Sequence, residues 1–410
     1  MSLEHSIAVL SDYLGITISK QSLNERFSER AVKFVKEVFK QALEIELEYF
    51  YNGTLFAQFN YVRIKDSTKF NVDNRLEKQF KGNGGGKNFK KACVCIQYEY
   101  DIKSGKILDL SITPGIIPDA TNAKETQCNI RNRDLIIRDL GYYNLEVLTA
   151  FEKCQAFFIS RLNMSTSIYC VRDGTKISFK ELYAAMIGKK VSSLEMEVLV
   201  SKGQKKKLRM IVTIIPEKEY EKKLRKINKY NKDNGYTTSD DYKDRSRFSI
   251  FITNIAVNMM VKEEILLLYK LRWQIELTFK AWKSVCAIDK LQPMKYERYI
   301  CVLISKLILI ALRMKLFWYI NNFFFRNKER LLSLDKCFKS FQETYQIFKA
   351  ILKTEKQESE KNLSRYVKLF SKNHWKEKRN NRTNYEEIIN LFICDSNNYT
   401  YLKEVKERAA

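Results

Sequence analysis

The order of strand-like and helix-like segments between Phe59 and Leu162 constrains the fold more than any other feature of this sequence. Runs rich in β-branched and aromatic residues predict three consecutive strands, and the segments after them alternate between helix and strand. Three consecutive strands suit a meander, and the alternation suits strands joined by crossover helices. The sequence therefore predicts an α/β chain with a mixed sheet. The expected strands are 61–72, 92–102, 106–113, 135–138 and 156–162. The expected helices are 119–132 and 145–154, the second of them capped by Asn144.

The segments before and after this core differ from it in their expected secondary structure and in their charge. Ser19 and Ser28 are expected to cap helices 20–27 and 29–50, a helix-turn-helix arrangement that fits either a DNA-reading unit or a small helical cap. Beyond the core, short strands alternate with lysine clusters and predict a basic insertion. The expected domains are 1–58 (helical, a candidate DNA-binding region), 59–164 (first part of the core), 165–248 (β-rich basic insertion), 249–290 (a helix completing the core) and 291–410 (helical and basic).

The charge balance indicates a polyanionic partner. Formal net charge is +25, from 73 Lys and Arg against 48 Asp and Glu, on a chain that is 45% hydrophobic and so able to build a core. Nucleic acid is the leading candidate and an anionic membrane surface the second. The apolar stretch 300–325 is interrupted by basic residues and predicts a buried helix, not a membrane span. With nine Cys, no C-x-x-C pair, two His and no targeting segment, the sequence favours a reducing cytoplasm and disfavours zinc.

One glycine-rich segment invites a phosphate-loop interpretation. Gly82-Asn-Gly-Gly-Gly-Lys87 lacks the Walker spacing, because Lys81 replaces the first glycine and Asn88 replaces the hydroxyl residue. We therefore expect a flexible connection between strands.

Four polar residues fall on one stripe of an expected long helix, 261–284. At about 100° per residue, Tyr269, Arg272, Glu276 and Lys283 lie within roughly 60° of one another. A neighbouring apolar stripe would anchor the helix in a core. A carboxylate flanked by cations suits a site that holds a metal together with a phosphate, whereas the alternative is an ordinary solvated face. The anchoring stripe consists of Leu268, Leu271, Ile275, Phe279 and Trp282.

Two aspartates could complete such a site. A two-metal phosphoryl-transfer centre needs about three carboxylates around hard cations, and Asp66, Asp139 and Glu276 are the candidates. Asp66 lies within the first strand, and Asp139 follows strand 135–138. Each has an alternative interpretation, as a turn former for Asp66 and an Asx-type turn for Asp139. A competing acid, Asp119, is assigned to helix capping.

Together these residues resemble the insertion-sequence-four family of bacterial DDE transposases. The resemblance covers roughly residues 60–300. It rests on the pattern Y-x2-R-x3-E-x6-K, which Tyr269, Arg272, Glu276 and Lys283 form in the expected helix 261–284. It implies a ribonuclease H-like core with a β-rich insertion between the second Asp and the Glu. The supporting blocks are Lys65-Asp66-Ser-Thr68, Ile137-Arg-Asp139-Leu-Gly-Tyr142, Ile252-Thr-Asn254 and Leu271-Arg-Trp-Gln-Ile-Glu276.

The resemblance also implies roles for particular residues. Asp66, Asp139 and Glu276 would bind two Mg²⁺, which Mn²⁺ can replace, for cleavage at transposon ends and attack of the freed 3′-OH on target DNA. The DNA phosphates would be held by Tyr269, Arg272 and Lys283. Candidates for stacking on a flipped base are Phe248, Phe251 and Trp273, with packing the favoured role of the two phenylalanines.

The implied partners are double-stranded DNA, as terminal inverted repeats and as target, and a second copy of the chain in the end complex. The resemblance also implies that 249–290 holds the catalytic helix and that 291–410 serves DNA-end binding or dimerisation. No membrane partner is implied, and the location would be the bacterial cytoplasm, at the nucleoid. Two alternatives stay open from the residues alone. One is a ribonuclease H-like endonuclease without strand transfer, and the other is a catalytically inactive DNA-binding regulator.

Overall fold

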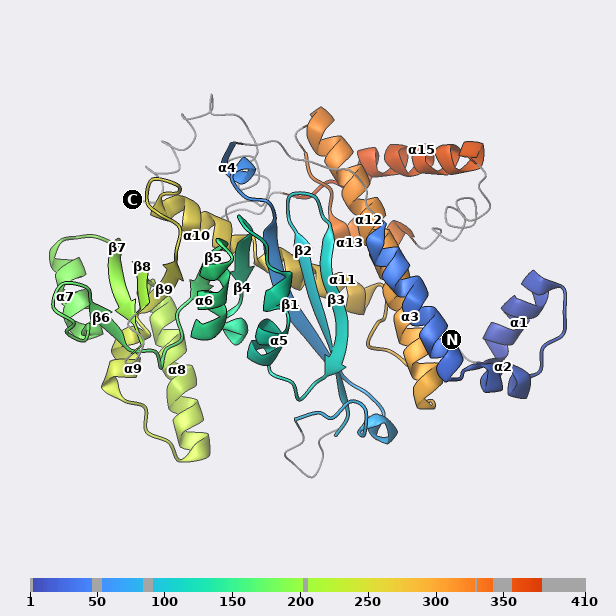
Figure 1. Ribbon diagram of the computed structural model, residues 1–410, viewed down its shortest axis with the longest axis horizontal. Helices are drawn as coiled ribbons and strands as arrows, with labels where there is room; N and C mark the ends of the chain where they lie inside the picture. The colour runs from blue at the N-terminus through green and yellow to red at the C-terminus, as the bar shows by residue number, and fades with distance from the viewer. Residues whose placement is uncertain are drawn as a thin grey trace. The chain divides into compact units, whose positions relative to one another are not determined.

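The chain folds into two compact units, each assembled from separate segments. The computed structural model describes residues 3–45, 54–83, 91–201, 206–328, 330–341 and 356–377. Unit 1 comprises Met1–Tyr51, Lys65–Pro118 and Trp273–Asn390, and unit 2 comprises Asn52–Ile64, Asp119–Arg272 and Leu391–Ala410. Figure 1 labels the elements of both units.

Strands β1 (Val62–Asn71), β2 (Cys93–Asp101) and β3 (Ile107–Pro114) form the sheet of unit 1 in the order β3-β2-β1, with β1 entering this unit at Lys65. β2 and β3 pair antiparallel, with a register shift between Glu99 and Tyr100. Nearly every residue of β2 is buried, including Gln97, Glu99 and Asp101, which alternate with aromatic side chains in its second half. Gly105, with φ of +73°, makes the turn from β2 to β3.

Helices cover much of unit 1. The longest, α12, is a 33-residue helix whose side chains are buried on most sides, and it lies beside α3. Lys315 of α12 donates to the Leu43 carbonyl at 3.0 Å, so it neutralises the C-terminal end of α3. The helices are α1 (Leu3–Leu14), α2 (Lys20–Arg26), α3 (Glu29–Glu44), η1 (Asn74–Leu76), α11 (Trp273–Ser284), α12 (Tyr296–Lys328), α13 (Leu334–Ser340) and α15 (Lys356–Asn373).

The sheet of unit 2 begins at the start of β1, where the Leu135 amide donates to the carbonyl of Tyr61, the residue just before β1, at 2.8 Å. From there the strand order is β1-β4-β5-β9-β8-β7-β6. β4 and β5 are parallel, whereas the pairs β5–β9, β9–β8, β8–β7 and β7–β6 are antiparallel. The strands are β4 (Leu135–Arg138), β5 (Phe157–Arg161), β6 (Ile168–Cys170), β7 (Ser193–Val200), β8 (Lys206–Ile214) and β9 (Phe248–Thr253).

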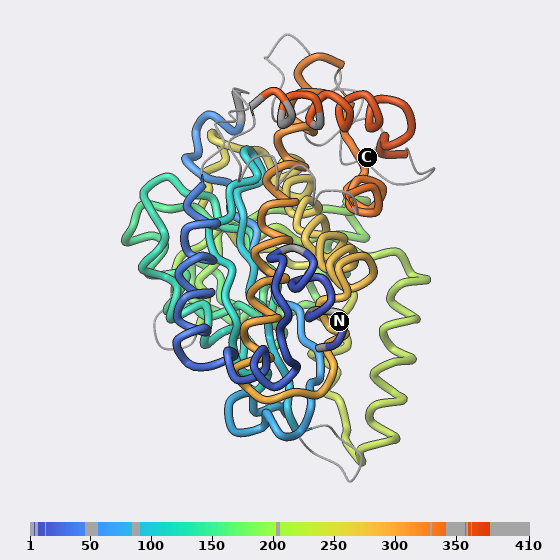
Figure 2. The backbone as a smooth tube through the Cα atoms, turned by 90° about the vertical axis from the view of Figure 1, so that its right-hand side faces the viewer, coloured from blue at the N-terminus to red at the C-terminus, as the bar shows by residue number. Residues whose placement is uncertain are grey.

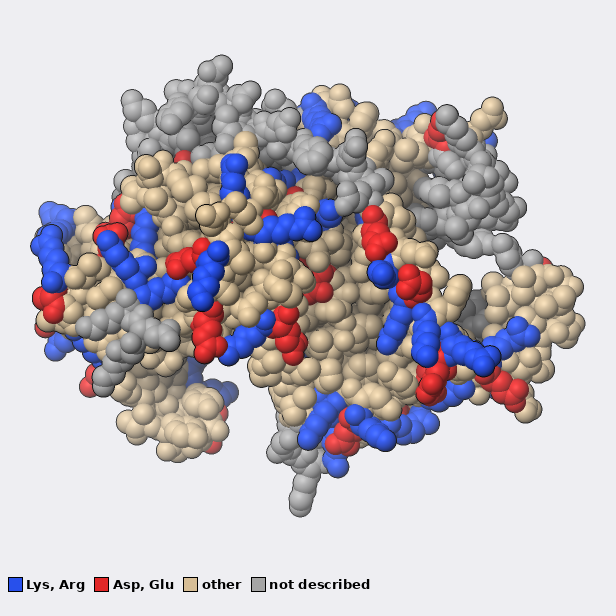
Figure 3. Space-filling model, viewed as in Figure 1, with Lys and Arg blue, Asp and Glu red and all other residues tan. Residues whose placement is uncertain are grey.

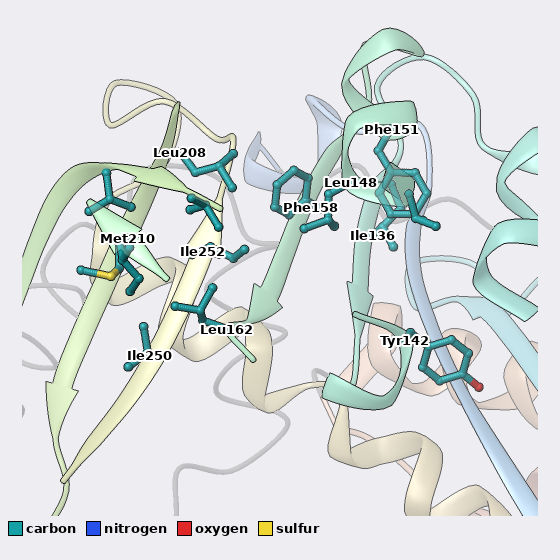
Figure 4. Packing of buried hydrophobic residues seen from close by; sticks show 14 of the residues in the cluster. Ile136, Tyr142, Leu148, Phe151, Phe158, Leu162, Leu208, Met210, Ile250 and Ile252 are labelled. Atoms are coloured by element: carbon teal, nitrogen blue, oxygen red, sulfur yellow. The ribbon is translucent and has the colours of Figure 1, made fainter. Parts of the chain in front are cut away.

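A hydrophobic core runs through unit 2. Leu148 and Phe151 of α6 lie against Ile136 and Phe158 of the parallel strands (Figure 4). Full burial of each such side chain stabilises the fold by about 1.5–3 kcal/mol. The helices of this unit are α4 (Thr54–Ala57), α5 (Asp119–Glu125), η2 (Gln127–Asn129), η3 (Leu140–Tyr142), α6 (Leu145–Lys153), α7 (Phe179–Gly188), α8 (Glu217–Asn234), α9 (Asp240–Arg245) and α10 (Lys262–Lys270).

Many local expectations are confirmed. The core strands match within about a residue at each end, and Ser19, Ser28 and Asn144 accept capping bonds at the starts of α2, α3 and α6. Stretch 300–325 lies inside the buried helix α12, and none of the described helices is both long and apolar enough to cross a membrane.

The expectation of one continuous helix over 261–284 is wrong. α10 ends at Lys270 and α11 begins at Trp273, with Leu271 and Arg272 in a turn between them. The amides of Leu271 and Arg272 bond to carbonyls three residues back, at 3.0 and 3.1 Å, which tightens the end of α10. Helix 119–132 is likewise shorter, since it is α5 followed by η2, and α3 ends at Glu44. The glycine-rich segment after Asn83 lies outside the described residues.

Candidate active site

Helix α11 presents Glu276 and Lys283 from one face. The two residues are seven positions apart, close to two full turns, so their side chains point the same way. From a neighbouring stripe of the helix, Phe279 and Trp282 pack against Tyr98 of β2, and their ring centroids lie 6.2 and 4.9 Å from that of Tyr98. This aromatic contact fixes α11 on the sheet of unit 1 and therefore sets the position of Glu276.

Strand β1 presents Asp66 on the face opposite its neighbour Lys65, because successive side chains of a strand alternate. Lys65 is fully buried and its Nζ lies 2.7 Å from Asp109 Oδ2 on β3. Asp66 is half-buried, and its Oδ1 accepts from the Ser67 amide at 2.8 Å. The buried ion pair thus holds the strand register from one side, while Asp66 is directed to the other.

Asp66 and Glu276 line the same pocket of unit 1, although they are far apart in the sequence. The pocket has a volume of about 570 Å³. Lys283 also lines it, and its Nζ donates to the Lys69 carbonyl of β1 at 3.1 Å, so α11 and β1 are tied together beside the two acids. The complete lining is Asp66, Ser67, Glu276, Phe279, Lys280, Lys283, Ser284, Asp289 and Lys290.

Unit 2 holds the other three candidates. Asp139 directly follows β4, and its side chain is 42% exposed and makes no capping bond to η3, so the Asx-turn alternative is not seen. Arg272 Nε lies 3.8 Å from Asp139 Oδ1. Tyr269 packs edge-on against Phe251 at 4.8 Å, and burial raises the pKa of its phenol to about 12, with Arg272 opposing that rise. The phenol is therefore a neutral hydrogen-bond donor at neutral pH.

A buried clamp supports α10 and the residues that it carries. The guanidinium of Arg209 on β8 bonds to the Ile255 and Met260 carbonyls at 3.2 and 2.7 Å, and to Glu195 at 3.0 Å through Nε. Asn254 bridges to β5, because its side chain accepts from the Phe158 amide at 2.9 Å and donates to the Ala156 carbonyl at 2.9 Å. These bonds fix the connection from β9 to α10 and so orient Tyr269.

The acids fit a hard cation by their chemistry, because carboxylate oxygens are the ligands that Mg²⁺ prefers. Asp66 and Glu276 belong to unit 1 and Asp139 to unit 2. Among the residues that the structure describes, no three His, Cys, Asp or Glu side chains gather closely enough to hold one ion. The structure thus brings Asp66, Glu276 and Lys283 together in one unit, and Asp139, Tyr269 and Arg272 in the other.

The aromatic candidates differ in exposure. Phe248 is 3% exposed and packs against Phe179 and Tyr183, while Phe251 is 7% exposed and packs against Tyr269. Trp273, at the start of α11, is 38% exposed. A base could reach Trp273 without opening a core, which the two phenylalanines would require.

Sequence reasoning missed some residues of the pocket. Lys280 lies one turn after Glu276 on α11, so helical spacing alone could have found it. Asp289 and Lys290 follow the end of α11, where no periodicity applies and no sequence signal marks them. Arg209 was also missed, because a buried arginine in a basic segment reads as one more exposed cation.

Comparison with known proteins decides which family these features belong to. Residues 57–312, which contain every candidate acid, match the transposase DDE domain family. The chain belongs to the DDE transposases. The resemblance to DDE transposases is thereby confirmed, and the expected α/β fold with a mixed sheet is present, with strand order β3-β2-β1 in unit 1 and β1-β4-β5 in unit 2.

Individual relatives of this transposase agree with the family assignment. The transposase for insertion sequence element IS231F of Bacillus thuringiensis subsp. israelensis is 30% identical over 92% of this chain and 82% of its own length. The transposase for IS1151 of Clostridium perfringens is 27% identical over 78% of this chain and 69% of its own length. Among solved structures, a chain of the piggyBac transposase synaptic complex with hairpin DNA matches at 12% identity, with a TM-score of 0.40, over 80% of this chain and 60% of that one.

Family membership establishes the reaction class. DDE transposases are divalent-metal-dependent enzymes that cleave DNA and join its strands, so this transposase binds DNA and carries out phosphoryl transfer on it. The comparisons therefore support neither of the two alternatives, an endonuclease without strand transfer or a catalytically inactive regulator.

Proposed function

We propose that this transposase moves an insertion sequence by cut-and-paste transposition, with Asp66, Asp139 and Glu276 as its metal-binding carboxylates. The observation that carries this proposal is the shared pocket of Asp66 and Glu276, two acids from distant parts of the chain beside Lys283. Asp139 supplies the third carboxylate at the end of β4, where its side chain makes no capping bond. In the active enzyme these three side chains converge on the metal ions.

Two Mg²⁺, or Mn²⁺ in their place, would activate the attacking oxygen and stabilise the leaving oxygen when held by these carboxylates. The remaining requirement is to position DNA and balance its charge. Lys283 offers a point charge at the pocket of unit 1. Arg272 offers a planar fork for two phosphate oxygens, and Tyr269 offers a neutral hydroxyl donor.

The proposed partners follow from the reaction. The enzyme would bind the terminal inverted repeats of its element, cut there, and transfer the 3′-OH ends to target DNA. Two protomers would act together on paired ends, because two ends must be joined to one target. Of the three aromatic candidates, Phe248, Phe251 and Trp273, the exposed Trp273 would stack on a flipped base.

Removal of the divalent metal tests the chemistry directly. The probe is a labelled duplex that carries an end of the element, its sequence to be taken from the DNA that flanks the gene, together with a supercoiled target plasmid. We expect cleavage and strand transfer in Mg²⁺, complete loss of both in EDTA, and recovery when Mg²⁺ is restored. Gel mobility shift should show that duplex binding persists in EDTA, since the cations of the protein are unchanged.

The products of that assay separate the alternatives. Cut ends without any joined product would indicate an endonuclease and contradict the proposed strand transfer. Binding with neither product, in Mg²⁺ and in Mn²⁺, would indicate an inactive regulator.

Tyr269→Phe tests the proposed phosphate donor. The variant keeps the ring packed on Phe251 and removes only the hydroxyl, so unfolding stability should change by less than about 1 kcal/mol. Binding of a pre-cut end should weaken by about three- to tenfold, the value of one lost hydrogen bond to an anion. Equilibrium titration at fixed salt gives the affinity, and chemical denaturation gives the stability. Unchanged affinity with unchanged stability would remove Tyr269 from the DNA contact.

A further inference from the structure

Helix α8 projects from unit 2 with almost no support from the rest of that unit. Of its 18 residues only Tyr220, near the start, is buried. In Figure 2 this yellow-green helix stands clear of the strands of its own unit. It ends at Gly235, whose φ of +67° makes a left-handed C-cap, and α9 follows as the chain returns. We refer to residues 217–245 as the arm.

The base of the arm is firmly anchored. The Arg247 guanidinium lies 4.1 Å from the ring centroid of Tyr220, and Lys223 donates to the Ser246 carbonyl at 3.3 Å. At the end of α9, Arg245 is buried and donates to the Thr166 carbonyl at 2.6 Å. A well-anchored base with an exposed shaft suits a helix that reaches toward another molecule.

The shaft carries uncompensated positive charge. Lys222 and Arg225 pair with Glu219 and Glu221 on the same helix, at 2.7 and 3.4 Å. Further along, the exposed side chains of Lys226, Lys229 and Lys232 have no carboxylate within 4.0 Å in the described part of the chain. On a helical wheel these three lie within about 120° of one another, on the side away from Leu224 and Ile227.

The three lysines of the shaft occupy a short length of helix. On the face shown in Figure 3, the described acidic and basic side chains lie interspersed, so the excess of cations is not gathered there into one broad patch. Lys226 to Lys232 spans about 9 Å of helix. Over that length a DNA duplex carries roughly five phosphate charges, which is enough to engage all three lysines.

An aromatic pair marks the tip of the arm. Tyr230 and Tyr236 stack with centroids 5.9 Å apart and planes at 4°, and they are 59% and 62% exposed. The tip is held by the Tyr236 amide, which donates to the Asn231 carbonyl at 3.1 Å, and by Thr238, which donates to the Asn231 side chain at 3.0 Å. Two ordered aromatic rings in water beside cations provide an apolar platform with hydroxyl donors at its edge.

We propose that the arm is a DNA-binding surface outside the candidate active site. Lys226, Lys229 and Lys232 neutralise phosphates of a duplex, and the Tyr230–Tyr236 pair packs against its sugars and base edges. The proposal rests on the proposed function for its choice of partner, double-stranded DNA. Charge complementarity supports that choice, because a polyanion matches three cations on one face of an exposed helix.

The triple variant Lys226→Gln/Lys229→Gln/Lys232→Gln tests the charges. Glutamine has nearly the helix propensity of lysine, so α8 should keep its helicity. Fluorescence anisotropy of the full chain with a duplex, from 50 to 300 mM NaCl in EDTA, gives the slope of log affinity against log salt. We expect the slope to become shallower by about 2–3, because each lost phosphate contact removes about 0.9.

A charge-matched control is Lys153→Gln/Lys180→Gln/Lys189→Gln, three exposed lysines of the same unit on α6 and α7 or at its end. Its slope should stay within about 0.5 of the wild-type value. An equal change in both triple variants would show a general effect of net charge and overturn the assignment to the arm.

The tyrosine pair is tested by Tyr230→Leu/Tyr236→Leu. Affinity should fall by about tenfold at every salt concentration while the slope is preserved, because rings are lost and charges are not. Unchanged affinity would overturn the role of the tip. Arm-dependent binding to phosphatidylglycerol vesicles, with an unchanged DNA slope, would assign the arm to a membrane surface and overturn the proposal.

Failure of the arm can be told apart from failure of the proposed function, because the anisotropy is measured in EDTA. If the wild-type chain joins ends in Mg²⁺ and the arm variant keeps its slope, only the arm proposal falls. If the slope changes as expected and no cleavage occurs in Mg²⁺, the arm proposal stands and the proposed catalysis falls.

Discussion

Replacing Glu276 with Gln is expected to lower metal-dependent cleavage of a transposon-end duplex by at least about a thousandfold. The substitution keeps the size of the side chain and its place on α11, but it removes the negative charge that would hold a cation next to Asp66. A loss of that size corresponds to about 4 kcal/mol of transition-state stabilisation. Asp66→Asn and Asp139→Asn should behave in the same way. Single-turnover cleavage of a labelled duplex in Mg²⁺ measures the effect.

Asp289→Asn is the matched control for these variants. Asp289 lines the same pocket but lies outside the motif, after the end of α11. We expect less than a tenfold change in its cleavage rate. All four variants should bind the duplex in EDTA with nearly wild-type affinity, because each removes a negative charge and no cation. Cleavage by an Asp66, Asp139 or Glu276 variant at a rate comparable to wild type would refute the triad.

Gly105→Ala is expected to destabilise unit 1 by about 3–5 kcal/mol, the range seen for severe overpacking combined with backbone strain. A Cβ at this position would lie 2.1 Å from Cγ of Trp318, whose bulky ring cannot yield within the buried helix α12. The backbone φ of +73° adds strain for any residue with a Cβ. Urea denaturation, followed by tryptophan fluorescence, reports the loss.

Gly235→Ala separates the two causes. Gly235 has a similar φ of +67°, but a Cβ there would meet nothing within 4 Å. Its cost should therefore be the backbone term alone, about 1 kcal/mol. Equal destabilisation by the two substitutions would mean that the contact with Trp318 contributes nothing.

Sequence patterns predicted the local elements well, because caps and periodicity are local properties. The runs that became β1, β2 and β3 alternate or are continuously apolar, and Ser28 and Asn144 cap where side-chain oxygens are expected to do so. The five anchoring residues assigned to the apolar stripe are all buried, each at 6% exposure or less.

The break between α10 and α11 could not have been predicted. Leu271 and Arg272 are both good helix formers, and no glycine or proline marks the position. The chain leaves unit 2 at this point, so packing in two different cores outweighs the propensity to continue one helix. The stripe of four motif residues is consequently divided, with Tyr269 and Arg272 before the break and Glu276 and Lys283 after it.

Contacts between distant segments were equally hidden from sequence reasoning. Nothing in the sequence shows that Lys65 is fully buried against Asp109, or that Lys283 bonds to the backbone of β1. Pairings of this kind depend on the completed sheet. Spacing predicted which residues carry the motif but gave no information on which backbone each of them would touch.

The division of both units into separate segments has a consequence for synthesis and for gene decay. Unit 1 includes Trp273 and the residues after it. During synthesis its three strands therefore leave the ribosome before α11 and α12, the helices that complete this unit, have been made. A copy of the gene that is interrupted by a stop codon before that point would encode neither a finished core nor a carboxylate at position 276. Partial copies of the reading frame should therefore yield protein that is cleared by proteases, and no partially working enzyme.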